Sequence, residues 1–551
     1  MNTPLIECVP NFSEGQDLSI IKQITGEIEK VEGVRLLDCD PGKATNRTVV
    51  TFVGTPDAVI EAAFLAIKKA GELIDMSKHK GEHPRMGATD VCPLIPVANI
   101  TMEETAAYSR KLAERVGREL GIPVYLYEAA QDKTERKNLS VIRAGEYEGF
   151  FKKIKLPEWK PDFGPAELPA RSGATVIGAR DFLVAYNVNL NTTSVRRANA
   201  VAFDIREAGR KIKNADGTET TKPGTLKAVK AIGWFIQEYG IAQVSINLTN
   251  INITPMHIAF EECVKSAAAR GMRVTGSELV GLIPLRCMLD AGKYFLARQQ
   301  RSTGVSEEEL IRMAIRSLGL DELSPFDPDK KIIEYVLRQS SQKKLVNLSL
   351  RAFANETAAE SPAPGGGSVS AYMGALGISL ATMVANLSSH KKGWDERWEA
   401  FSAHAEKGQK LKDELLHLVD EDTLAFNRIM EAFALPKSTA EEKSIRSEAI
   451  QAATRNAIEV PLKVMQLCCE SLTTIETMVK EGNPNSVSDA GVGALAARSA
   501  VLGAYLNVKI NSSSLTDANA KASYIEKAEA LKQLALEKET EILAAVESTM
   551  K

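Results

Sequence analysis

Short apolar runs and amphipathic stretches alternate along the first quarter of the chain. Hydrophobic residues spaced three and four apart indicate amphipathic helices, and short runs rich in Val, Ile and Thr between turn residues indicate strands. On these patterns residues 1–130 predict strands at 5–9, 34–37, 48–53, 91–97 and 124–127, and helices at 18–28, 56–74 and from 101 onward. This order of elements matches the split βαβ plan.

Two local signals bound these elements. Asp40-Pro41-Gly42 is typical of a turn between the two middle strands, and Thr101 with Glu104 forms a capping box that starts the third helix.

A second run of elements in the same order follows. Residues 182–336 predict strands at 182–190, 229–236, 243–248 and from 273, and helices at 194–209, 256–270 and after Pro284. Either an internal duplication or the wide recurrence of α/β element orders explains the repeat. Two similar subdomains that face each other would leave a cleft between them, where ligands usually bind. The polar insert 212–223 is expected to be a surface loop.

The pattern changes near residue 325. Pro325 and Pro328 break the chain, a polar stretch at 339–344 follows, and strand signals are few beyond it. We therefore predict a multidomain protein in which two α/β, split βαβ-like subdomains (1–181 and 182–336) precede a linker (337–350) and an all-α domain (351–551). Residues 368–390 approach the composition of a membrane span, but polar residues interrupt them and favour a close-packed helix of a soluble domain.

Composition narrows the class of protein. The chain has 551 residues, with 68 Lys and Arg against 71 Asp and Glu, so its net charge of −3 gives no overall attraction to nucleic acid or to an anionic membrane. Seven cysteines without CxxC spacing argue against a disulfide framework or a zinc site. The first ten residues lack the features of a secretory signal. We expect a cytoplasmic protein without a metal ion.

The loop at residues 79–90 is the first candidate for a catalytic site. It holds His79 and His83, and Pro84 disfavours helical backbone angles at His83. Histidine changes charge near neutral pH, so His83 is the candidate general acid/base, with His79 in support. The alternative is that His83 only hydrogen-bonds the loop together.

Charged residues around this loop have candidate binding roles. Arg47 or Arg85 could hold substrate carboxylates by bidentate pairing, and Asp40 or Glu82 could orient His83 or a cationic substrate group. An arginine in such a loop can instead tie backbone carbonyls.

The junction between the two predicted subdomains is the candidate binding loop. It is too rich in Gly and Pro for regular structure and too varied for a flexible linker. Its central residues are Gly164, Pro165, Ala166, Glu167, Leu168, Pro169, Ala170, Arg171, Ser172 and Gly173. Upstream, lysines interleave with aromatic residues at 150–160, which suits either a flat anionic ligand or a solvated surface.

Two features mark a second candidate site in the helical half. Gly365, Gly366, Gly367 and Ser368 place bare backbone amides at the start of a helix, a geometry that binds anions, although the glycines also suit a tight turn. Asp422 falls on the apolar stripe of its predicted helix, where burial would raise its pKa towards acid/base values. A structural hydrogen bond is the alternative role for Asp422. The polar loop 483–489 is a further candidate for completing this site.

The motifs of the first half resemble a known family. Residues 7–15, 38–48, the GEHPRMG loop, 124–127 and 143–148 together closely resemble glutamate formimidoyltransferase. The resemblance implies transfer of a formimidoyl group from N-formimidoyl-L-glutamate to N5 of tetrahydrofolate. It assigns His83 as the acid/base catalyst and the Gly164 to Gly173 loop as the folate site.

The second half resembles formimidoyltetrahydrofolate cyclodeaminase. The matching stretches are 363–368, the residues from Asp420 to Phe426, and 503–508. This resemblance implies closure of N10 onto the formimidoyl carbon with loss of ammonia, giving 5,10-methenyltetrahydrofolate, with Asp422 as the catalytic aspartate.

Together the two resemblances cover almost the whole chain. They imply a cytosolic homo-oligomer, an octamer, that uses polyglutamylated folate. The alternatives are a folate-binding scaffold that has lost one or both activities, and a cyclohydrolase that acts on methenyl-folate alone.

Overall fold

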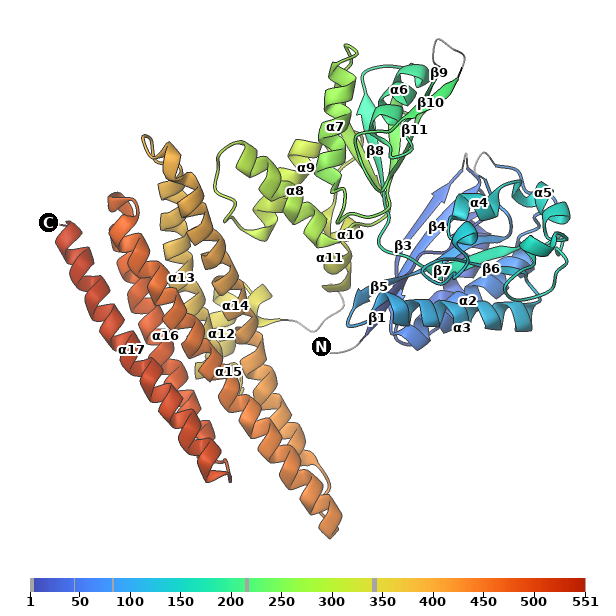
Figure 1. Ribbon diagram of the computed structural model, residues 1–551. Coiled ribbons are helices and arrows are strands. Elements are labelled where there is room, and N and C mark those ends of the chain that lie inside the picture. Colours follow the sequence, from blue (N-terminus) through green and yellow to red (C-terminus); the bar gives the residue numbers. More distant parts are fainter. Residues whose placement is uncertain (1–3, 44, 82–83, 214–217, 339–343, 551) are drawn as a thin grey trace. The chain divides into compact units, whose positions relative to one another are not determined.

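The computed structural model describes residues 4–43, 45–81, 84–213, 218–338 and 344–550 (Figure 1). These fall into two compact units. The first unit is Met1–Cys287 with Leu318–Gln339, and the second is Met288–Ser317 with Ser340–Lys551. The described part of the first contains three β-sheets, of seven, four and two strands, and the described part of the second is helical.

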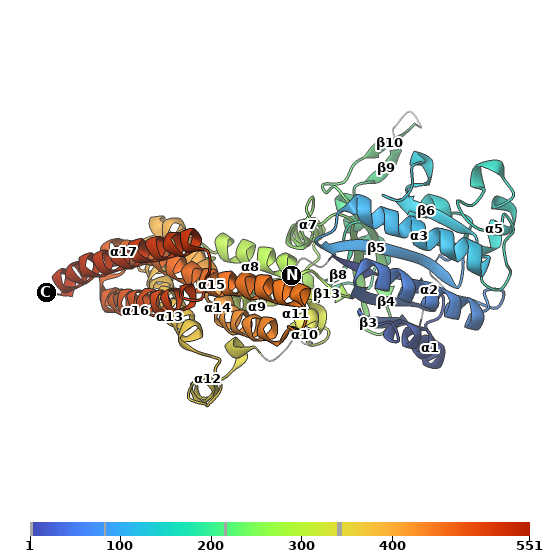
Figure 2. The same ribbon diagram turned by 90° about the horizontal axis from the view of Figure 1, so that it is seen from below.

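The first sheet has seven strands in the order β1-β4-β2-β5-β7-β6, with β3 beside β4. Its strands are β1 (Leu5–Cys8), β2 (Asn11–Phe12), β3 (Val34–Gly42), β4 (Arg47–Gly54), β5 (Thr89–Ala98), β6 (Val124–Glu128) and β7 (Thr175–Ala179). Helices α1 (Leu18–Glu29), α2 (Pro56–Leu73) and α3 (Met102–Leu120) lie side by side along it (Figures 1 and 2).

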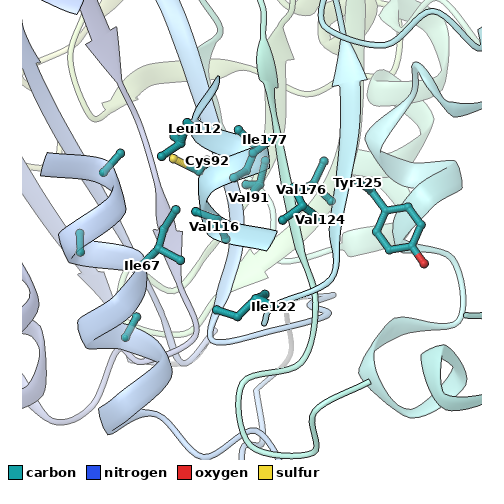
Figure 3. Packing of buried hydrophobic residues seen from close by; sticks show 14 of the residues in the cluster. Ile67, Val91, Cys92, Leu112, Val116, Ile122, Val124, Tyr125, Val176 and Ile177 are labelled. Carbon is teal, nitrogen blue, oxygen red and sulfur yellow. The ribbon is translucent and has the colours of Figure 1, made fainter. Parts of the chain in front are cut away.

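The core of this sheet lies against α2 and α3. Side chains from α2, such as Ile67, and from α3, such as Leu112 and Val116, meet Cys92 of β5 and Ile177 of β7 (Figure 3). Because side chains alternate across a strand, the neighbours of these core residues point to the opposite face of the sheet. That face is therefore available for a site.

Most predicted elements of this part are present, including the Thr101–Glu104 capping box. Two differ. The strand predicted to stop before Asp40 continues to Gly42, because β3 stays paired with β4 as far as Gly42 opposite Arg47. Strand β7 was not predicted. It follows the Gly- and Pro-rich loop directly and pairs in parallel with β5 and β6.

The second sheet has four antiparallel strands in the order β11-β12-β8-β13. They are β8 (Val184–Leu190), β11 (Val229–Ile236), β12 (Ile241–Leu248) and β13 (Val274–Val280), with helices α6 (Val195–Ile205) and α7 (Met256–Ala268) packed against them. The insert predicted to be a loop instead contains the exposed hairpin strands β9 (Arg210–Lys213) and β10 (Glu219–Lys222).

Short helices complete the first unit. They are α4 (Leu139–Arg143), α5 (Glu146–Lys153), α10 (Pro328–Lys331) and α11 (Ile333–Arg338).

The described part of the second unit is a bundle of helices, most of them long. They are α12 (Leu350–Thr357), α13 (Gly366–Ser389), α14 (Trp398–Ala434), α15 (Ala440–Glu481), α16 (Val487–Ser512) and α17 (Ala518–Met550). The unit also takes in α9 (Glu307–Leu318) as far as Ser317 and most of α8 (Leu285–Arg298). The loop between α8 and α9 docks on α14, where Thr303 hydrogen-bonds to Ser402 at 2.9 Å.

Small residues allow α13 and α16 to pack closely. A Cβ on Gly377 would lie 2.8 Å from the Gly493 carbonyl oxygen, so only glycine fits there. Helix α13 and the stretch Pro484–Ser512 are long and apolar enough to cross a membrane, yet 61% and 50% of their most apolar windows are buried in the structure. Core helices of a bundle share this composition, so these two carry no membrane assignment.

Candidate functional site

A cavity of about 940 Å³ lies between the two larger sheets of the first unit. Its lining includes Glu7, Val9 and Asn11 from the first sheet, and Lys230 and Asn247 from the second. Glu7 and Val9 alternate with Ile6 and Cys8, which are fully buried in the core on the other face. The cavity therefore borders the face of the first sheet that is opposite helices α2 and α3.

Three arginines give the cavity a basic wall: Arg47, Arg143 and Arg180. Arg47 and Arg143 both donate to one carboxylate oxygen of Asp90, at 2.5 and 2.6 Å, and the Asp90 side chain has no solvent exposure. Arg47 also donates to Asn11 Oδ1. One buried negative charge thus holds two arginines at the cavity wall, where guanidinium groups suit the carboxylates of a ligand. Carboxyl residues also line the cavity, so it can bind groups of either charge.

Glu7 is the buried acid of this cavity. Its side chain is 4% exposed, and burial raises its pKa from 4.5 to about 7, an effect that the positive charge of Arg180 opposes and the negative charge of Glu334 strengthens. No hydrogen bond from another described residue reaches its carboxyl oxygens. Such a carboxyl can exist in either protonation state near neutral pH.

The residues predicted around the catalytic loop have different positions. His83 and Glu82 lie outside the described residues. Asp40 and Arg47 both line the cavity, as candidates for substrate binding should. His79 is tied into the loop, since its Nε2 lies 2.9 Å from the carbonyl oxygen of Asn46.

The side chain of Arg85 is held by neighbouring residues of the first unit. Its guanidinium donates to both carboxylate oxygens of Glu148, to Glu146 and to Nδ1 of His79, and it is not part of the cavity lining. Its fork is occupied by these partners. Arg85 therefore fastens α5 to the loop, and its role in binding substrate carboxylates stays a prediction.

The Gly164 to Gly173 loop adjoins the stretch that follows His83. Ala88 donates its backbone N–H to the Ser172 carbonyl, and Ala174 donates to the Met86 carbonyl. Gly164 and Gly173 have φ values of 85° and 66°, conformations that favour glycine. None of the ten residues is in the lining of the described cavity. Their role in folate binding stays a prediction.

A second site lies at the start of α13. Asp422 of α14 accepts hydrogen bonds from the backbone N–H of Ser368 at 2.8 Å and from its hydroxyl at 3.2 Å. Burial raises the pKa of Asp422, and these bonds oppose the rise. The carboxylate thus sits against the amide end of a helix, where negative charge is stabilised. Gly366 and Gly367 lie beside it, and Gly365 is the N-cap.

One residue joins this site, and one predicted segment does not. The side chain of Asn507 on α16 comes close to Gly366. The loop at 483–489 does not complete the site, because Asn483 bonds Ser388 at the far end of α13. The helix has 24 residues, so that end lies about 36 Å away.

No group of three or more His, Cys, Asp or Glu that could hold a metal ion occurs within the part of the chain that the structure describes.

The structure thus has two candidate sites. One is the arginine-lined cavity of the first unit, and the other is the half-buried carboxylate of Asp422 at the glycine-rich start of α13 in the helical unit. Residues 5–180 match the family described as "Formiminotransferase domain, N-terminal subdomain", residues 185–338 match "Formiminotransferase domain", and residues 349–530 match "Formiminotransferase-cyclodeaminase". The chain belongs to the formiminotransferase-cyclodeaminase family.

Three relatives match different parts of the chain. The chicken (Gallus gallus) "Formimidoyltransferase-cyclodeaminase" is 45% identical over 93% of both chains. The Streptococcus pyogenes "Glutamate formimidoyltransferase" is 41% identical over 53% of this chain and 93% of its own. A Methylorubrum extorquens "Methenyltetrahydrofolate cyclohydrolase" is 37% identical over 31% of this chain and 82% of its own.

Sequence reasoning did not single out Glu7, Arg143 and Arg180, which line the cavity, or Asp90, which holds two of its arginines. Glu7 lies inside an apolar strand, and a polar residue within such a run signals a special role. For Asp90 and the two arginines no local signal exists, because their partners are distant in sequence.

Gly367→Ala is expected to damage the second site alone. A Cβ at Gly367 would lie 2.0 Å from Asp422 Oδ1, so the carboxylate must move away from Ser368. We expect at least about a tenfold loss of cyclodeaminase activity with the transferase activity retained, from the loss of a charge-assisted hydrogen bond. Gly26→Ala is the control, because a Cβ there meets nothing within 4 Å. Unchanged cyclodeaminase kinetics in Gly367→Ala would contradict this geometry.

Glu7→Gln is expected to change stability in a pH-dependent way. Below about pH 4.5 the carboxyl is protonated in both the folded and the unfolded chain, whereas above about pH 7 the folded chain must bury a charge. The folded state of the wild type therefore loses up to about 3 kcal/mol relative to Glu7→Gln as pH rises through this window. Thermal unfolding of both proteins from pH 4.5 to 8 measures the difference. Glu29→Gln, at an exposed position on α1, is the control, and a pH-independent difference for Glu7→Gln would refute the assignment.

Proposed function

We propose that the protein transfers the formimidoyl group from N-formimidoyl-L-glutamate to N5 of tetrahydrofolate. It then cyclises 5-formimidoyltetrahydrofolate to 5,10-methenyltetrahydrofolate with release of ammonia. The observation that carries the proposal is the 45% identity over 93% of the chain to a bifunctional relative, because the match spans both units. The separate match of the first half to a glutamate formimidoyltransferase supports the first activity on its own.

The transfer step needs a proton shuttle and a grip on anionic substrates. N5 attacks the amidine carbon, a tetrahedral adduct forms, and the bond to the glutamate nitrogen breaks after that nitrogen gains a proton. His83 is assigned the shuttle, since one histidine near neutral pKa can take the N5 proton and return it to the leaving amine. Arg47 and Arg143, which line the cavity, are assigned to the substrate carboxylates.

The cyclisation step needs a group that moves a proton between two nitrogens. N10 attacks the formimidoyl carbon and closes the ring, the N10 proton passes to the amino group, and ammonia leaves as the C=N double bond of the methenyl bridge forms. Asp422 is assigned this transfer, because its raised pKa lets it accept and release a proton. The hydrogen bonds from Ser368 hold the carboxylate in one orientation.

The finer assignments belong to the same proposal. Folate binds the Gly164 to Gly173 loop in polyglutamylated form, and neither site uses a metal ion. The chain divides into split βαβ-like subdomains at 1–181 and 182–336, a linker at 337–350 and an all-α domain at 351–551. It works as a cytoplasmic homo-oligomer, an octamer.

A cyclohydrolase is the second candidate for the helical unit. The Methylorubrum relative that covers 31% of this chain bears that name. Hydrolysis of methenyltetrahydrofolate would add water to the carbon that the cyclisation step closes, without releasing ammonia.

Two single variants separate the proposed sites. His83→Ala is expected to abolish glutamate release yet still cyclise preformed 5-formimidoyltetrahydrofolate, whereas Asp422→Asn should do the reverse. Loss of a positioned acid/base group typically costs about 10²- to 10⁴-fold in rate. Methenyl-folate absorbance and released ammonia and glutamate measure the steps. Loss of both steps in both variants would refute the two-site assignment, and methenyl-folate hydrolysis without ammonia-releasing cyclisation would favour the cyclohydrolase.

A further inference from the structure

We propose that Glu7 binds the positively charged formimidoyl group of the donor and so selects an amidinium over a neutral acyl group. This inference rests on the proposed transferase function and names a contact within its cavity. Glu7 belongs to β1, which is paired on both sides, with Val53 of β4 and Ile95 of β5 opposite it. Strand pairing on both sides fixes where its side chain enters the cavity.

The carboxyl has no structural partner that accounts for its burial. It is 4% exposed and lines the cavity, and no described residue donates a hydrogen bond to it. Burying a carboxylate without a partner costs several kcal/mol, so such a group is expected to meet a donor when the cavity is filled. The missing partner is therefore a hydrogen-bond donor supplied by the ligand.

The charges around the cavity complement those of the donor molecule. N-formimidoyl-L-glutamate carries two carboxylates and, because amidines are strong bases, one amidinium cation. Arg47, Arg143 and Arg180 suit the carboxylates, which leaves an anion to be found for the amidinium. Four of the described carboxyl residues line the cavity: Glu7, Asp40, Glu128 and Asp181. Asp181 is half-buried and accepts a hydrogen bond from the backbone N–H of Phe182, and Glu128, like Asp40, is exposed. Asp40 is exposed, so water and salt screen its charge, whereas Glu7 is buried.

Burial also explains how Glu7 would discriminate. With a pKa of about 7 the carboxyl exists in both protonation states near neutral pH, and a bound cation would favour the ionised form. The charged groups that act on it are Arg180, which follows β7, and Glu334 on α11. A neutral group in place of the amidinium offers no charge to compensate a buried carboxylate.

The test compares the donor with a neutral analogue. N-formyl-L-glutamate carries oxygen where the donor carries the amidinium nitrogen and keeps both carboxylates. In the full-length protein, Glu7→Gln is expected to raise the KM for N-formimidoyl-L-glutamate by about 10- to 100-fold, the value of a hydrogen bond between charged groups. The inhibition constant of N-formyl-L-glutamate and the KM for tetrahydrofolate should change less than about twofold.

Controls make each outcome decisive. Glu334→Gln removes a neighbouring negative charge but not a cavity-lining group, and its amide can still accept the bond from the Leu285 N–H, so it should keep the discrimination. Cyclisation of 5-formimidoyltetrahydrofolate by each variant reports on the rest of the chain. If Glu7→Gln folds poorly, Glu7→Asp keeps the charge and should retain the preference for the donor.

Three results would overturn the inference: equal weakening of donor and analogue, which indicates a structural role; a raised KM for tetrahydrofolate alone, which places Glu7 against the pterin; and no change. If the wild-type protein transfers no formimidoyl group to tetrahydrofolate, the proposed function fails instead. The two failures are therefore distinguishable.

Discussion

The carboxylate of Asp90 is the interaction on which the first candidate site depends. One of its oxygens accepts from Arg47 and Arg143, and the other accepts from the backbone N–H of Met86 at 3.0 Å. It thereby joins β4, α4 and the loop that follows His83 to β5. A fully buried charge keeps its place only when its partners satisfy it, and removing one partner of such a group typically costs about 3–5 kcal/mol. Two arginines of the cavity wall and the candidate catalytic loop thus share one anchor.

The second site uses a carboxylate in a different way. Asp422 is held by Ser368 at the start of α13, and the absence of a side chain on Gly367 makes the space for it. Asp90 is saturated by two cations, and its charge serves structure. Asp422 has neutral donors only and Glu7 has no described donor, so burial raises the pKa of both. The carboxyls suited to chemistry are those that the fold leaves short of partners.

The sequence-based predictions are accurate where a feature depends on residues close together in the sequence, and they fail where it depends on residues far apart in the sequence. Periodicity located most strands and helices, and it placed Asp422 correctly on an apolar stripe, because the position of a residue on a helix depends only on local spacing. The pairing of Arg85 with Glu146 and Glu148 could not be predicted because these partners lie some sixty residues away. The loop at 483–489 was placed at the wrong end of α13 because spacing gives a helix its length but not its neighbours. Strand β7 was missed because its five residues follow a loop rich in Gly and Pro.

Strand β1 contributes to the core with one face and to the cavity with the other. Ile6 and Cys8 have no exposed surface and pack into the core, while Glu7 between them enters the cavity. A shift of the strand by one residue would exchange these faces, so the same pairing with β4 and β5 that buries the core also fixes Glu7. An unpartnered carboxyl would weaken a strand held on one side only. Strand β1 is paired with both β4 and β5, and these backbone hydrogen bonds hold it in place although the burial of Glu7 is unfavourable. The side chain of Glu7 therefore stays in position for a ligand.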